Sequence, residues 1–172
     1  MNTTKSLFIT DPLVELNPKK DTTILWMQEV AKQSGQVFQC EISDLIYCDG
    51  LTHAKASEIP SVASQPQAAN APDGLLALNT FDYVFMRKDP PVDENYMNAL
   101  HLLSQAKNEG ANVMNDPDAL KKFNEKVFAL RFSKWMPDTR VICKQEDLLS
   151  FKEKYQTAVS YTHLTLPTST TV

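Results

Sequence analysis

Three charged side chains follow one apolar stretch near the middle of the chain. The stretch at 83–86, YVFM, favours a strand, and Arg87, Lys88 and Asp89 come directly after it, before two prolines. A guanidinium can bind a carboxylate or phosphate through paired hydrogen bonds, and a lysine adds a point charge. A neighbouring carboxylate can orient either cation. The cluster therefore fits two interpretations, a solvated turn or an anion-binding site at the end of a strand.

Other polar side chains stand at the ends of further predicted strands. Asp11 follows the apolar run at 6–10 and precedes a proline. Asn115 ends the run at 111–115. Because the carboxyl ends of parallel strands meet at one edge of a sheet, we expect these two residues and the charges at 87–89 to share the usual ligand crevice of α/β proteins. An ionised Asp11 accepts hydrogen bonds only, so it could bind a ligand's amino group, or it could simply end its strand.

Apolar patterning predicts an alternation of strands and helices. Predicted strands lie at 6–10, 36–42, 81–87, 111–115 and 139–143, and a hairpin with an Asp49-Gly50 turn spans 44–56. Predicted helices lie at 21–35, 93–110, 116–132 and 144–155, the third of which could be two helices. Residues 57–74, rich in Pro, Ala, Ser and Gln, are predicted to form a long surface loop. The order of elements predicts an α/β fold with a mostly parallel sheet flanked by helices.

The first predicted helix carries signals at both of its ends. Asp21 or Thr22 can cap its start, and Gly35 can supply its stop. Trp26, in its second turn, is assigned to the core because large aromatic side chains are mostly buried.

The bulk properties limit the classes of function. The 172 residues carry a net charge of -4, with 42% hydrophobic and 22% charged residues. This composition is typical of a globular domain and gives no whole-domain attraction to nucleic acid or to an anionic membrane. No apolar run approaches the roughly 20 residues of a membrane-spanning helix. We expect a cytoplasmic protein whose three cysteines are reduced thiols.

Several catalytic motifs are missing from the sequence. The four glycines are too far apart to cradle a phosphate, and there is no Walker-type loop. The cysteines lack metal-ligand spacing, so we predict no metal site in this chain. Neither His53 nor His101 belongs to a pattern that would indicate nucleophilic catalysis.

The last residues differ in composition from the rest of the chain. The segment 159–172 contains no charged residue and is rich in threonine. Within it, VSYTHLTLPT resembles the translation of a sequencing adapter, so we exclude 159–172 from fold reasoning and assign His163 no chemistry. On this interpretation the native protein continues past Ala158 and the chain is a fragment.

Several short motifs together resemble the N-terminal part of the bacterial glutathione synthetase family. They are DP at 11–12, KKD at 19–21, DL at 44–45, MRKDPP at 86–91, NDP at 115–117 and NEKVFALRFS at 124–133. The succession of MRKDPP, N-x-P and NEK is the most specific part of the resemblance, which covers 6–156. The loop at 57–74 is the least similar part.

The resemblance implies an ATP-grasp ligase that joins γ-glutamylcysteine to glycine through an acyl phosphate, with ATP and Mg²⁺ as cofactors. It implies a substrate-side α/β domain at 1–122, of the pre-ATP-grasp, Rossmann-like type, and a truncated start of the ATP-grasp domain at 123–158. The glycine-rich loop, a second ATP-binding lysine and the metal ligands of the family would lie beyond this point. We therefore expect the chain alone to be inactive.

The resemblance also implies roles for individual residues. The MRKDPP segment would lie on the wall of the peptide cleft, where Arg87, Lys88 and Asp89, with Asp11 at the same edge, would bind substrate. Lys126, in NEK, would be the family's first ATP-contacting lysine, close to the nucleotide phosphates. The implied partners are small molecules and not nucleic acid or membrane, and the full-length parent is expected to be a homo-oligomer.

Two alternative functions stay open. One is a different ATP-grasp amino-acid or peptide ligase. The other is a non-catalytic α/β ligand-binding or receiver-like domain, in which Asp11 and Lys88 would resemble a phospho-acceptor site. A receiver domain needs a second acidic residue beside the first strand, and Pro12 fits that pattern poorly.

Overall fold

A computed structural model describes residues 3–60, 62 and 74–155 of the chain. The chain divides into two compact units, Met1–Lys122 and Phe123–Val172. The predicted tail at 159–172 lies outside the described residues, as does most of the predicted loop at 57–74.

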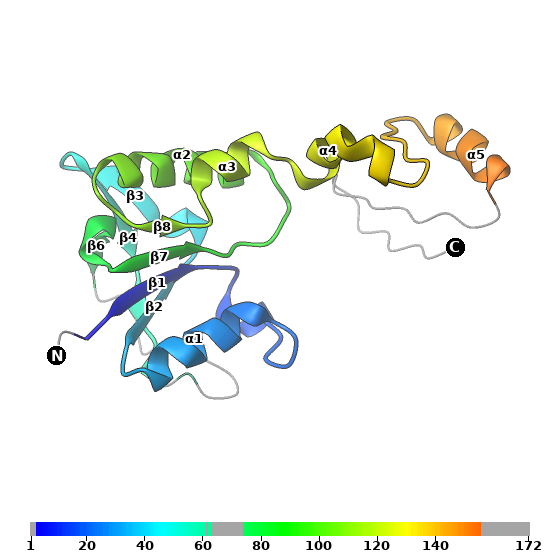
Figure 1. The fold of residues 1–172 in the computed structure, drawn as a ribbon. Helices are drawn as coiled ribbons and strands as arrows, with labels where there is room; N and C mark the ends of the chain where they lie inside the picture. The colour runs from blue at the N-terminus through cyan, green and yellow to red at the C-terminus, as the bar shows by residue number, and fades with distance from the viewer. Residues whose placement is uncertain (1–2, 61, 63–73, 156–172) are drawn as a thin grey trace. The chain divides into compact units, whose positions relative to one another are not determined.

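The first unit is built on a five-stranded sheet in which four strands run parallel (Figure 1). The strand order is β5-β2-β1-β7-β8, and β5 pairs antiparallel with β2. The bounds are β1 Lys5–Ile9, β2 Gln36–Cys40, β5 Ser57–Glu58, β7 Tyr83–Met86 and β8 Val113–Met114. The predicted α/β fold with a mostly parallel sheet is confirmed.

A second sheet of three antiparallel strands, β3-β4-β6, belongs to the same unit. Its strands are β3 Leu45–Cys48, β4 Leu51–Lys55 and β6 Leu75–Ala77. The predicted hairpin is confirmed: Asp49 and Gly50 have φ of 51° and 80°, the left-handed conformation that a two-residue turn of this kind requires at both positions.

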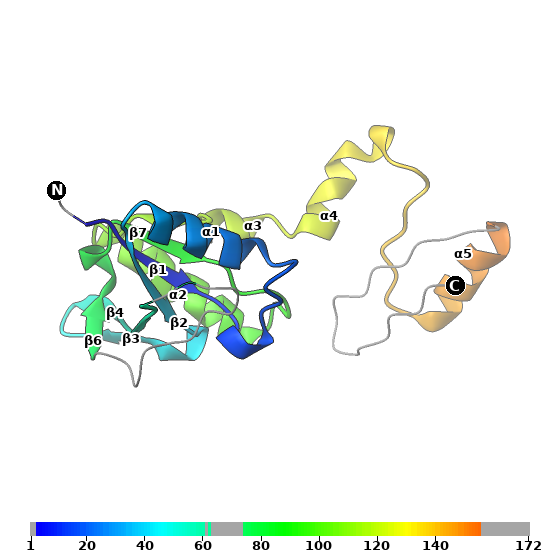
Figure 2. The same ribbon diagram turned by 90° about the horizontal axis from the view of Figure 1, so that it is seen from below.

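Helices cover both faces of the larger sheet (Figure 2). Helix α1, Thr22–Lys32, packs on one face, and α2, Glu94–Asn108, packs on the other, with α3, Pro117–Lys122, against α2. Short 3₁₀ segments are η1 Leu13–Glu15, η2 Ile42–Asp44 and η3 Leu78–Thr80.

Strand β1 is the centre of two apolar cores because its successive side chains point to opposite faces. Leu7 and Ile9 contribute to the core under α2, whereas Phe8 contributes to the core under α1. All three are fully buried, which explains why residues 7–9 form a continuous apolar run and do not alternate with polar residues.

Caps and turns fix where the two long helices begin and end. Asp21 accepts a hydrogen bond from the Thr23 backbone N–H at 2.7 Å, and Asp93 accepts one from the Tyr96 N–H at 2.8 Å. Gly110, with φ of 96°, ends α2 as predicted. The two aspartate caps therefore fix the residues at which the first turns of α1 and α2 begin.

Two expectations about α1 are corrected. Ser34, with φ of 60°, takes the left-handed position after the helix, and Gly35 serves a different purpose. A Cβ at Gly35 would lie 2.6 Å from Val30 Cγ1, so glycine is needed there for close packing. Trp26 is 43% exposed and lies outside the core.

Two predictions about loops and strands are wrong. Residues Ser57–Glu58 form strand β5 instead of starting a loop, because their backbone pairs with β2 and the neighbouring Ile59 is buried. Residues 139–143 form no strand: Val141 is 59% exposed, and the described residues supply no partner for an extended segment there. An extended segment without a partner leaves its backbone groups unpaired.

The second unit is helical where it is described. It contains α4 Glu125–Ala129, η4 Leu130–Trp135 and α5 Gln145–Lys154, and none of its described residues is buried. The helix predicted at 144–155 is confirmed, with Leu149 55% exposed. The helix predicted at 116–132 is divided into α3 and α4.

Candidate functional site

The carboxyl ends of β1 and β7 lie side by side at one edge of the larger sheet. Ile9 is paired with Met86 in the parallel register, and the Arg87 N–H donates to the Ile9 carbonyl at 2.8 Å. The register therefore brings Asp11 and the residues at 87–89 together, as topology predicts. We call Asp11, Arg87, Lys88 and Asp89 the strand-end cluster.

Asp11 and Lys88 form an ion pair that joins the two strand ends. Lys88 Nζ lies 2.8 Å from Asp11 Oδ1, and their side chains are only 16% and 22% exposed. The Asp89 backbone N–H donates to Asp11 Oδ2 at 3.1 Å, and Lys88 Nζ donates to the Asp89 carbonyl at 2.6 Å. Both oxygens of Asp11 thus have partners within the chain, and the charge of Lys88 is compensated.

Arg87 points to a different element, the first turn of α1. Its Nε donates to Thr23 Oγ1 at 3.2 Å, and its Nη2 donates to Thr22 Oγ1 at 2.8 Å. Its guanidinium carbon lies 5.1 Å from the centre of the Trp26 ring, within the range of a cation–π contact. The sequence gives no sign of these contacts, since the threonines precede Arg87 by 64 and 65 residues.

Asn115 reaches the same sheet edge from β8. Its Nδ2 donates to the Met86 carbonyl at 2.8 Å. This bond satisfies the last carbonyl of β7, so Asn115 supports the strand end on which the cluster stands. A direct ligand contact by Asn115 is not needed to explain its position.

Further carboxylates surround the strand-end cluster. Burial, followed by the charges of Asp44, Asp11 and Glu15, raises the pKa of Glu41 above its ordinary value, and Lys88 opposes the shift. The cluster therefore stands in a region where negative charge exceeds the positive charge of Lys88. Asp11 was predicted from the sequence to lie at this edge, but Glu41, which follows strand β2 and so shares the edge, was not.

Tyr96, in the first turn of α2, is a second residue whose link to the strand-end cluster was not predicted from the sequence. Burial raises the pKa of its hydroxyl, and the charge of Asp89 adds to the shift. Its spacing in α2 indicates only a core position. Nearby, an open groove of about 470 Å³ is lined by Val92, Asp93, Glu94, Met97, Asn98 and His101.

The other candidate groups give no catalytic arrangement. His53 Nδ1 lies 3.0 Å from the Leu51 carbonyl and 3.6 Å from Cys48 Sγ; a proton on Nδ1 shared with the carbonyl would leave that nitrogen unable to deprotonate the thiol. Burial raises the pKa of the Cys40 thiol far above its ordinary value, which makes this thiol unreactive.

The described residues do not fit a magnesium ion. They contain no group of three His, Cys, Asp or Glu side chains arranged to hold a metal. Within the same ranges, no helix has both the length and the apolar character that crossing a membrane requires. Lys126 belongs to the described backbone of α4, but its side chain lies outside the description, so its predicted nucleotide contact stays a prediction.

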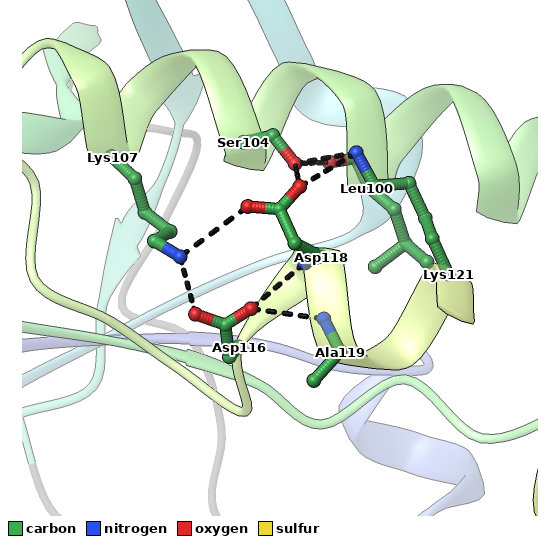
Figure 3. Close-up of polar contacts among 7 residues, drawn as sticks. All are labelled: Leu100, Ser104, Lys107, Asp116, Asp118, Ala119 and Lys121. Atoms are coloured by element: carbon green, nitrogen blue, oxygen red, sulfur yellow. Dashed lines mark hydrogen bonds and ion pairs between the residues drawn. The ribbon is translucent and has the colours of Figure 1, made fainter. Parts of the chain in front are cut away.

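A second charged cluster lies between α2 and α3 (Figure 3). Lys107 pairs with Asp116 and with Asp118, and Lys121 Nζ lies 2.9 Å from Asp118 Oδ1. Ser104 Oγ lies 2.7 Å from Asp118 Oδ1 and accepts from Lys121 Nζ at 2.7 Å. We call these five residues the helix-pair network.

The helix-pair network has a structural explanation. Asp116 Oδ1 accepts hydrogen bonds from the backbone N–H groups of Asp118 and Ala119, both at 2.9 Å, and so caps α3. The hydrogen bond from Lys107 lowers the pKa of Asp116, and those from Lys121 and Ser104 lower the pKa of Asp118 to about 2. The network therefore attaches α3 to α2.

The fold and its polar edge define a class: an α/β domain with cations and carboxylates gathered at the carboxyl ends of parallel strands. A family model described as "Prokaryotic glutathione synthetase, N-terminal domain" matches residues 4–121. The chain belongs to this family. The resemblance seen in the sequence motifs is thereby confirmed.

Individual relatives agree with the family match. The chain is 41% identical over 147 residues to a glutathione synthetase of Parasynechococcus marenigrum, an alignment that covers 86% of this chain and 47% of that protein. It is 36% identical over 156 residues to a glutathione synthetase of Neisseria meningitidis serogroup A, covering 88% and 49%. The chain thus spans about half the length of the curated relatives it matches.

Proposed function

We propose that this chain is the substrate-side part of an ATP-dependent ligase that joins γ-glutamylcysteine to glycine. The observation that carries the proposal is the family match over residues 4–121. In the proposed reaction the peptide carboxylate takes the terminal phosphoryl group of ATP to form an acyl phosphate. The amine of glycine then attacks the acyl carbon, and phosphate leaves.

In this proposal the strand-end cluster forms part of the wall of the peptide cleft. Arg87 binds a substrate carboxylate, because its guanidinium is held at the sheet edge and its charge is not consumed by an ion pair with any described residue. Asp11 and Lys88 hold the two strand ends in register, and Asp89 adds a carboxylate at the rim. Excess negative charge near Glu41 suits the ammonium group of an amino-acid-type substrate.

The second unit has the nucleotide-side role in this proposal. Lys126 would contact ATP, and Mg²⁺ would be held by residues of the family that this chain does not supply. No step of the reaction is therefore assigned to a metal bound by the described residues. We further propose a cytoplasmic location and a homo-oligomeric full-length protein, as the sequence resemblance implies.

A chimeric enzyme tests the proposal. Residues 1–155 would be joined to the segment that follows the matched region in the Parasynechococcus marenigrum relative. We expect glutathione formation that depends on ATP, γ-glutamylcysteine and glycine, whereas the 172-residue chain alone should show no turnover. A soluble chimera that ligates another amino-acid pair but not these substrates would favour the alternative ATP-grasp ligase, and one that binds ATP without ligating anything would contradict the proposal.

A further inference from the structure

We infer that Thr22, Thr23 and Trp26 are positioning residues that hold the Arg87 guanidinium in place for a substrate carboxylate. The inference rests on the proposed function, since it names how the substrate-side cation is prepared. It concerns a helix that no motif of the sequence marks as functional.

The contacts hold Arg87 along one edge of its guanidinium, and the Trp26 ring adds a further contact. Thr23 Oγ1 accepts from Nε at 3.2 Å, and Thr22 Oγ1 accepts from Nη2 at 2.8 Å. The guanidinium carbon lies over the Trp26 ring, 5.1 Å from its centre. Thr23 is itself buried, with 2% exposure, so the acceptor of the Nε bond is rigidly placed.

The same contacts leave a defined edge of the guanidinium open. Nε and Nη2 donate from one edge of the planar group, and both threonine hydroxyls lie along that edge. The terminal edge, formed by Nη1 and the second hydrogen of Nη2, remains outside these contacts. Two parallel N–H groups on that edge match the two oxygens of a carboxylate.

The charge environment also indicates that Arg87 is prepared for an anion. Threonine hydroxyls are neutral, so they orient Arg87 without cancelling its charge, unlike Asp11, which compensates Lys88. The guanidinium moreover lies at the first turn of α1, where the helix dipole disfavours a cation and favours an anion. A bound carboxylate would relieve this conflict.

The contacts of Thr22, Thr23 and Trp26 with the Arg87 guanidinium, called the clamp from here on, can be tested on the 172-residue chain without assuming any function. The chain has three arginines, Arg87, Arg131 and Arg140, so the arginine Nε–H signals in a nitrogen–proton NMR spectrum can be assigned with Arg87→Lys. We expect a slowly exchanging Nε–H for Arg87 in the wild-type chain and in Thr23→Ser, and rapid exchange in Thr23→Val. An Arg87 signal that is unchanged in Thr23→Val would overturn the clamp.

The role of the clamp is tested in the chimera. Freeing a long side chain costs about 0.5–1.5 kcal/mol when it must be ordered again on binding, so Thr22→Val with Thr23→Val should raise KM for γ-glutamylcysteine about twofold to tenfold. We expect kcat and the KM for ATP to change less than this, and the matched double serine variant to restore KM. A structural defect would lower kcat and would not be specific for one substrate.

The outcomes separate this inference from the proposed function. An active chimera whose KM for γ-glutamylcysteine is the same in the valine and serine variants would overturn the inference alone. A chimera that binds ATP but forms no glutathione would overturn the proposed function together with the role assigned to the threonines. The NMR result would still decide whether the clamp exists.

Discussion

The two charged clusters of the first unit differ in how their charges balance. In the helix-pair network, Lys107 and Lys121 face Asp116 and Asp118, so cations and carboxylates are equal in number. The strand-end cluster itself has two cations and two carboxylates, with Lys88 paired to Asp11, but Glu15, Glu41 and Asp44 add negative charge beside it. Arg87 is held by neutral hydroxyls. A balanced network is sufficient to attach a helix, whereas the strand-end cluster, with excess negative charge beside it and Arg87 held by neutral groups, has the charges that we propose a ligand uses.

The carboxylates of the helix-pair network and Glu41, which lies beside the strand-end cluster, respond to acid in opposite directions. Asp116 and Asp118 have lowered pKa values, so each stabilises the fold above the ordinary pKa of aspartate, and this contribution is lost as the pH falls through the folded-state pKa. Glu41 has a raised pKa, so its ionisation opposes folding once the pH rises above the ordinary value of 4.5. Excess like charge of this kind is tolerated at functional sites.

The largest effect on stability is expected from removing Lys88. Lys88→Met leaves the mostly buried Asp11 carboxylate without its cation, which should cost about 2 kcal/mol of unfolding free energy. Lys107→Met is the matched control, because its partners are exposed and can be solvated. Urea unfolding, followed through Trp26 in a Trp135→Phe background that leaves no other tryptophan, gives the unfolding free energy of both variants. Equal losses of unfolding free energy in Lys88→Met and Lys107→Met would contradict the view that the ion pair of the strand-end cluster is the more buried one.

A smaller effect is expected from the cap of α3. Asp116→Ala removes both the cap and one of the two carboxylate partners of Lys107, so it should lower the Tm by a few degrees. Asp116→Asn keeps an oxygen that can cap and loses only the charge, so its Tm should stay closer to that of the wild type. If the Tm of Asp116→Asn fell as much as that of Asp116→Ala, the charge of Asp116 and not its capping hydrogen bonds would hold α3 in place.

The smallest effects should appear in the pH dependence of stability. Asp118→Asn should destabilise the chain at neutral pH, and the difference from wild type should vanish as the pH falls from 3.8 to about 2. Glu41→Gln should stabilise the chain slightly at neutral pH, and the difference from wild type should shrink as the pH falls through the raised pKa toward 4.5 and be absent below it. Thermal unfolding across this range checks both signs. If both substitutions stabilised the chain at neutral pH, or both destabilised it, the opposite pKa shifts of Asp118 and Glu41 would be contradicted.

The sequence predicted the location of the strand-end cluster because topology alone determines it. Once β1 and β7 are parallel and in register, Asp11 and Lys88 must lie at one edge. The orientation of Arg87 could not be predicted in the same way, since it depends on hydroxyls of α1 that are 64 and 65 residues earlier. Local patterns do not encode such distant contacts.

The errors in the predicted elements have a related cause. Strand β5 has only two residues, too few for periodicity, and exists because β2 offers a free edge. The run at 139–143 has strand-favouring residues but no partner among the described residues, so its local preference is not realised. Trp26 stays 43% exposed although Arg87 and the Phe85 ring contact it. In each case tertiary contacts, or their lack, decided the outcome.

Steady-state kinetics of the chimera test most directly the proposal that the sheet edge presents Arg87 to a substrate carboxylate. Arg87→Ala removes charge-assisted hydrogen bonds and should lower kcat/KM for γ-glutamylcysteine about tenfold to a hundredfold. Lys32→Ala, at the far end of α1 in an exposed pair with Glu29, is the control and should stay close to wild type. An active chimera in which Arg87→Ala retained the kcat/KM of the control would contradict this proposal.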